Sequence, residues 1–131
     1  MEQPKPSREM DARVHQALWP DDEVEFVEAW PGDATWSGWK AYWRCIRNGQ
    51  LEHLPHYSTN LAAWDGVSDS RGWYWYAEEH YDKVHVRLYD GGPLGKVEMY
   101  EASVLGTEIP NRHAAWALGM SRCILQWAER R

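Results

Sequence analysis

Near the middle of the chain lies the stretch that decides the local fold: His53-Leu54-Pro55-His56-Tyr57-Ser58-Thr59-Asn60-Leu61-Ala62-Ala63-Trp64. Pro55 disfavours the α conformation for the residue before it, and the Ser-Thr-Asn cluster supplies a helix cap. The stretch therefore predicts a strand, a corner and then the start of a helix. Polar and aromatic side chains gather at that predicted helix N-terminus.

A helix N-terminus can receive an anion, because its first amides lack partners within the helix and carry the positive end of the dipole. Two interpretations of the hydroxyls at Ser58 and Thr59 stay open. They cap the helix, which contributes about 1 kcal/mol, or they bind a phosphate group. Under the second interpretation His56 and Tyr57 lie beside the ligand, Trp64 or Trp73 stacks on a base, and Arg87 or Arg112 supplies charge.

The chain before this stretch predicts a helix and three strands. Ser7 caps a helix that ends before Pro20. A short edge strand at 24–30 follows, and residues 39–47 alternate cleanly between two faces, as in a half-buried strand. Asn48-Gly49 is a strong hairpin signal, because both residues tolerate a positive φ. Residues 50–54 then form the returning strand.

The chain after it predicts a meander and a long helix. Strands at 73–77 and 84–89 and a third from Val97 to about Ala102 form a three-stranded antiparallel meander. Asn111 caps the final helix. Its predicted buried stripe is Trp116, Met120, Cys123, Ile124 and Trp127, and its polar side carries Arg112, Arg122, Arg130 and Arg131. The predicted fold is α+β: one antiparallel sheet, made of the hairpin and the meander, on which N-terminal, short central and long C-terminal helices pack.

The central stretch also carries a resemblance. Leu-Pro-His-Tyr-Ser-Thr, followed by an amide and an Ala-Ala-Trp helix, resembles the signature of the phage ABA sandwich domain, a family of small phage and prophage proteins. The opening helix from Ser7 and the alanine-rich closing helix near Asn111 agree with it. The chain departs from the family at 65–72, where glycine and serine end the helix after Trp64 early. The resemblance implies a fold and a phage origin more firmly than an activity.

Length and composition narrow the function further. With 131 residues, the chain predicts a flexible tail at 1–6 and a single domain at 7–131. Its net charge of −6 argues against binding duplex nucleic acid. No apolar run is long enough to span a membrane and no signal peptide is visible, so we expect a cytoplasmic protein. The resemblance implies that the cell is an infected or lysogenic bacterial host. Cys45 and Cys123 are expected to be reduced core residues.

No catalytic or metal-binding motif is present. His53 and His56, and likewise His80 and His85, lack a carboxylate or cysteine at ligand spacing and are expected to be turn and surface residues. We therefore expect no cofactor, no metal and no enzymatic activity.

Two functional classes remain. The first, which the resemblance implies, is a phage accessory protein that acts against host immunity by sequestering a small anionic ligand, for example a cyclic nucleotide signal. The second is an inhibitor that docks the acidic segment 21–25 and exposed aromatic side chains on a host defence protein. The ten tryptophans, among them Trp73, Trp75, Trp39 and Trp43, also predict a homo-oligomer, because they offer more flat apolar area than three modest helices cover.

Overall fold

The computed structural model describes residues 5–27, 42–65, 67, 71–91 and 97–130. Trp39, Arg131, the end of the predicted strand at 24–30 and most of the predicted tail lie outside these ranges. The described part is an α+β fold with two α-helices and two antiparallel three-stranded sheets. The α+β class predicted from the sequence is thus confirmed.

The N-terminal half forms a helix and a small sheet. Helix α1 (Arg8–Leu18) begins where the Ser7 hydroxyl accepts a hydrogen bond from the Met10 amide at 3.0 Å. The N-terminal sheet has the order β1-β2-β3, with β1 (Glu23–Val27), β2 (Tyr42–Arg47) and β3 (Gln50–His53). Asn48 and Gly49 have φ angles of 51° and 78°, which confirms the predicted tight hairpin.

The C-terminal half forms the predicted meander and the long helix. The C-terminal sheet has the order β4-β5-β6, with β4 (Trp73–Glu79), β5 (Lys83–Asp90) and β6 (Glu98–Leu105). Val84, Val86 and Leu88 of β5 are buried under α2 (Arg112–Glu129), which packs on β5 and β6. Gly119 permits this close approach, because a Cβ atom there would lie 2.5 Å from Cγ2 of Val86.

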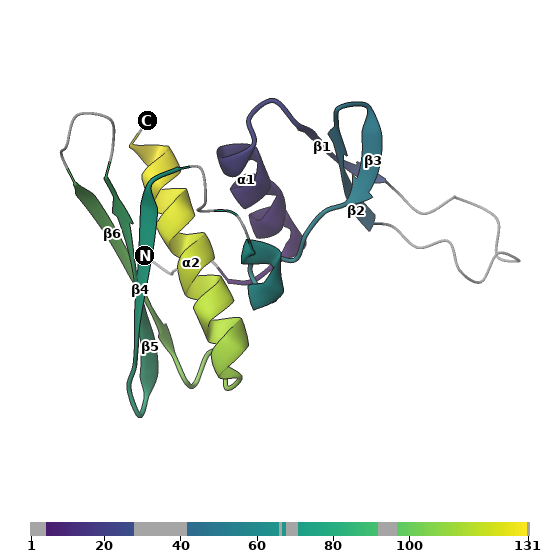
Figure 1. The fold of residues 1–131 in the computed structure, drawn as a ribbon. Coiled ribbons are helices and arrows are strands. Elements are labelled where there is room, and N and C mark those ends of the chain that lie inside the picture. The colour runs from purple at the N-terminus through teal and green to yellow at the C-terminus, as the bar shows by residue number, and fades with distance from the viewer. Residues whose placement is uncertain (1–4, 28–41, 66, 68–70, 92–96, 131) are drawn as a thin grey trace, which may run out of the picture.

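The predicted single sheet is wrong, because the hairpin and the meander belong to separate sheets. Helix α2 contacts the C-terminal sheet, α1 contacts α2, and β1 contacts α1. Figure 1 shows the resulting layers, with the two helices between the two sheets. Both helices bury side chains against the adjacent elements, so the helices keep the sheets apart.

Two smaller expectations also fail. The short central helix is a single 3₁₀ turn, η1 (Leu61–Trp64), and it is capped by Asn60 rather than by Ser58 or Thr59. Arg122, expected on the polar side of the final helix, is only 3% exposed. Its guanidinium donates to the carbonyl of Ser103 and to Glu108, each at 3.1 Å. The side chain lies against β6 and the loop that follows β6, which supply these acceptors.

The face of the C-terminal sheet that points away from α2, which we call the outer face, carries rows of paired residues. Two of these rows are Tyr74–Tyr89–Met99 and Tyr76–Arg87–Glu101. Within the part of the chain that the structure describes, no helix packs on this face. No described helix is long and apolar enough to cross a membrane.

Candidate functional site

The central stretch is joined to helix α1 through Asp11, which is 1% exposed. One carboxylate oxygen of Asp11 accepts the Ser58 amide at 2.8 Å, and the other accepts the Arg8 guanidinium at 2.6 Å. Arg8 also donates to the carbonyls of Leu54 at 2.5 Å and Pro55 at 3.2 Å. Arg8 and Asp11 therefore hold the Leu54–Ser58 corner against the first turn of α1.

Three of the amides near the expected anion site already have partners. The amides of Thr59 and Asn60 donate to the carbonyl of His56 at 3.2 and 2.8 Å, and the Ala62 amide donates to the Asn60 side chain at 3.0 Å. The Ser58 hydroxyl is buried and lies 3.4 Å from the Ser7 carbonyl. Of the four site residues predicted at 56–59, His56 and Thr59 are exposed, whereas Tyr57 and Ser58 are buried. The local geometry favours a capping role for this stretch.

Tyr57 belongs to a buried polar chain between α1 and the N-terminal sheet. Its hydroxyl lies 2.9 Å from Nδ1 of His15, and Nε2 of His15 lies 3.0 Å from Asp22, which also accepts from Arg47 at 3.1 Å. Burial raises the pKa of Tyr57 to about 12. Burial also lowers the pKa of His15 below its ordinary value, although the hydrogen bond that His15 makes to Asp22 opposes this. A neutral His15 that donates to Asp22 and accepts from Tyr57 satisfies all three groups.

Trp64 and Trp73, the predicted stacking residues, are buried in a continuous run of aromatic rings. Trp64 contacts Tyr57 and Trp75 with ring centroids 5.4 and 5.6 Å apart, and Trp73 contacts Trp75 and Trp127 at 6.5 and 5.1 Å. The Trp64 indole donates to the Tyr57 carbonyl at 2.9 Å. These rings form the core between the central stretch and α2, and they present no open face to a base.

The two predicted arginines lie on different surfaces. Arg87 is on the outer face, 3.5 Å from Glu101 and with its guanidinium over the ring of Tyr76. Arg112 is the first residue of α2, and it donates to Glu79 at 3.1 Å. Of the eight predicted site residues, the structure brings Tyr57, Ser58, Trp64 and Trp73 into or against the core and leaves the other four exposed or half-exposed.

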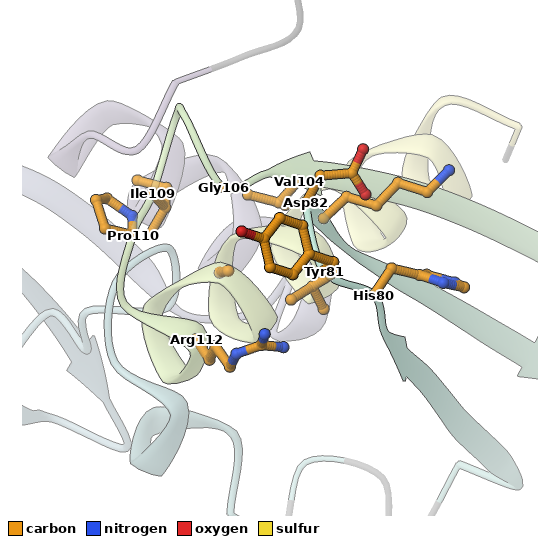
Figure 2. A pocket seen from close by; sticks show the side chains of 11 residues that line it. His80, Tyr81, Asp82, Val104, Gly106, Ile109, Pro110 and Arg112 are labelled. Carbon is orange, nitrogen blue, oxygen red and sulfur yellow. The ribbon is translucent and has the colours of Figure 1, made fainter.

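Arg112 borders a hollow of about 70 Å³ between the β4–β5 turn, the loop before α2 and the first turn of α2. Figure 2 shows the Arg112 side chain directed toward the ring of Tyr81, whereas the ring of His80 points away from Arg112. Tyr81 is fully exposed. Lys83, Asp82 and Ile109 also line the hollow. Its volume suits one phosphate-sized group, with the rest of a larger ligand lying outside.

Sequence reasoning missed Tyr81 and Lys83 as neighbours of Arg112. The turn at 80–83 and the loop at 106–110 are far apart in the chain, and their approach depends on the crossing of α2 over the sheet. The only signal was Tyr81 itself, an aromatic residue within the polar run 78–83. Among the described residues, no three His, Cys, Asp or Glu side chains form a group that could hold a metal ion.

Comparison with known proteins found no match. No family model, no curated protein and no solved structure is significantly similar to this chain. The functional argument therefore depends on the residues and geometry of this molecule.

Proposed function

We propose that this protein is a non-enzymatic phage accessory protein that sequesters a small anionic ligand, such as a cyclic nucleotide immune signal. The observation that carries the proposal is the hollow at the start of α2, which Arg112 and the exposed Tyr81 both line. A phosphate group held by Arg112 would gain a charge-assisted hydrogen bond and the favourable end of the helix dipole. A base or other planar group would stack on Tyr81.

The pairing of Arg112 with Glu79 is compatible with ligand binding. The Arg112 and Glu79 side chains are 50% and 43% exposed, so their ion pair is screened by water and costs little to exchange. Glu79 is also held at 3.1 Å by the indole of Trp116, which keeps the carboxylate in place when Arg112 turns to a phosphate.

Thermal melting against cyclic di- and trinucleotides and cyclic ADP-ribose derivatives tests the proposal. A ligand at a hundred times its dissociation constant adds about 2.7 kcal/mol of stability. We expect a shift that Arg112→Gln and Tyr81→Ala abolish. Arg13→Gln, an exposed arginine of α1, is the matched control and should keep the shift.

The same assay separates the two locations considered for the ligand. If His56→Ala or Thr59→Val removes the shift while Arg112→Gln retains it, the ligand binds at the central stretch instead of the hollow. If no compound shifts the melting of the unmodified protein, sequestration of this class of signal is refuted.

A host defence protein is the second candidate partner, and the edge strand β1 favours it. Asp21, Glu23 and Phe26 are exposed along this edge, whereas Asp22 and Glu25 are engaged by His15, Arg47 and Arg44. Exposed acidic groups would steer the protein to a basic surface, and Phe26 would anchor it. The double charge reversal Asp21→Lys with Glu23→Lys should then remove binding of the partner in a pull-down from host lysate. It should leave any ligand-induced melting shift unchanged.

A further inference from the structure

The N-terminal sheet contributes little to the hydrophobic core. Of the described residues in β1, β2 and β3, Cys45 is the one with a buried side chain, and all of β3 is exposed. The buried hydrophobic cluster comes from α1, the segment 57–67, the C-terminal sheet and α2. Figure 1 shows α1 between the N-terminal sheet and α2. A unit with so few buried apolar contacts opens at a lower free energy than the core.

The N-terminal sheet is attached to α1 through polar contacts around His15, which is 2% exposed. Nε2 of His15 lies 3.0 Å from Asp22, in the turn before β1, and Asp22 also accepts from Arg47 of β2 at 3.1 Å. The guanidinium of Arg47 lies 4.3 Å from the ring centre of Trp19, which directly follows α1. The attachment therefore depends on the protonation state of one imidazole.

A proton added to His15 would disturb the hydrogen bonds of Tyr57. The neutral imidazole accepts from the Tyr57 hydroxyl through Nδ1. Trp19 is also hydrogen-bonded to Tyr57, and an indole N–H can only donate. Once Nδ1 carries a proton, the Tyr57 oxygen faces two donors and its own hydrogen loses its acceptor. A buried donor without an acceptor costs free energy, so protonation weakens the closed arrangement.

The charges around His15 set the direction of the pH effect. Burial is the largest effect on the pKa of His15 and lowers it, Arg47 lowers it further, and Asp22 and Glu52 raise it. The net result is a pKa below 6.5 while the sheet covers the ring. In an open form water solvates the ring, and its pKa returns toward 6.5. The closed form is therefore fully favoured above pH 6.5, and acid favours the open form.

We propose that the N-terminal sheet is a pH-controlled flap on α1, released as a unit when His15 takes up a proton. The central stretch stays on α1, because Asp11 holds the Ser58 amide and Arg8 holds the Leu54 carbonyl. Helix α2 and the C-terminal sheet stay folded, because their hydrophobic cluster does not include β1, β2 or β3. The flap is closed at neutral pH and open in mild acid, where His15 and Cys45 contact water.

Thiol labelling of the full chain with 4,4′-dithiodipyridine tests the proposal, because the two cysteines report on separate parts of the fold. Cys45 lies in β2 and Cys123 in α2, and both are buried. Each rate is divided by the rate of the same cysteine in the urea-unfolded chain at the same pH. Between about pH 7.5 and about pH 5 the normalised rate of Cys45 should rise, by at most about thirtyfold, while Cys123 stays protected. That limit applies to a group that has a pKa of 6.5 in the open form.

The variant His15→Gln assigns the effect to His15. A glutamine side chain can donate to Asp22 and accept from Tyr57 but does not titrate, so the rise in acid should disappear. His113→Gln, at an exposed position of α2, is the matched control and should keep the rise. The proposal is wrong if acid leaves the Cys45 rate unchanged, if both cysteines become labelled together, or if His15→Gln keeps the full rise. Even where His15→Gln does not fold, comparing the two cysteines in the unmodified protein distinguishes release of the flap from unfolding of the whole chain.

Discussion

Replacing Asp11 should destabilise the protein more than replacing any other acidic residue of the first helix. Asp11→Ala removes the partner of the buried Ser58 amide and of Arg8, whose side chain is 28% exposed. An unsatisfied buried amide costs about 1–3 kcal/mol. Loss of a fully buried ion pair costs about 3–5 kcal/mol, but the partly exposed Arg8 recovers some hydration. A total loss of about 3–4 kcal/mol is therefore expected.

Two further variants make the experiment decisive. Asp11→Asn keeps an oxygen that can accept the Ser58 amide but removes the charge opposite Arg8, so its loss should be intermediate. Glu9→Ala changes an exposed acidic residue in the same helical turn and should cost little. Urea unfolding monitored by tryptophan fluorescence measures the three values. If Asp11→Ala loses less than about 1 kcal/mol, the corner is not held by this carboxylate.

Three other predictions concern the core. Gly119→Ala should lose about 1–2 kcal/mol, because its Cβ would lie 2.5 Å from Val86, and Val86→Ala in the same chain should recover part of that loss in urea unfolding. Cys45 and Cys123 are free and buried, and burial raises the pKa of both thiols, that of Cys123 to about 12. Neither should react with a thiol reagent at neutral pH until the protein is unfolded, and rapid labelling of the native protein would contradict this. Burial lowers the pKa of His15 below 6.5, so the unfolded chain takes up this proton first as the pH falls. The contribution of a neutral, buried His15 to the free energy of unfolding is therefore complete above pH 6.5 and is lost as the pH falls toward the folded pKa. An NMR titration of the His15 imidazole in the folded protein with a midpoint at or above pH 6.5 would refute this.

Local signals in the sequence predicted the elements well. The Ser7 cap, the Asn48-Gly49 turn and the alternation along Val84, Val86 and Leu88 each depend on residues close together in the chain, and each matches the structure. The division into two sheets could not be predicted in this way. Alternation tells which side chains share a face, but it does not tell which strands pair across a gap filled by two helices.

The buried Arg122 shows the same limit on the final helix. An amphipathic pattern predicts one buried stripe, and a charged residue outside that stripe is expected in water. Helix α2 instead packs against the C-terminal sheet on one side and against α1 and η1 on another. Arg122 lies beside β6 and the loop before α2, where Ser103 and Glu108 accept its hydrogen bonds. The hydrophobic pattern of the sequence predicts the face of α2 that packs on the sheet. The contacts of α2 with α1 and η1 are known only from the tertiary structure.

The central stretch was the most specific part of the sequence, and its geometry explains that specificity without a ligand. Arg8 donates to the carbonyls of Leu54 and Pro55, and Asp11 accepts a hydrogen bond from the Ser58 amide. The Tyr57 hydroxyl is hydrogen-bonded to His15. Each partner comes from α1, so the stretch and the first helix must have matching residues for the fold to form. A ligand site on this protein does not need to share these residues. This is why ligand binding is proposed at Arg112, where a substitution can remove binding and leave the fold intact.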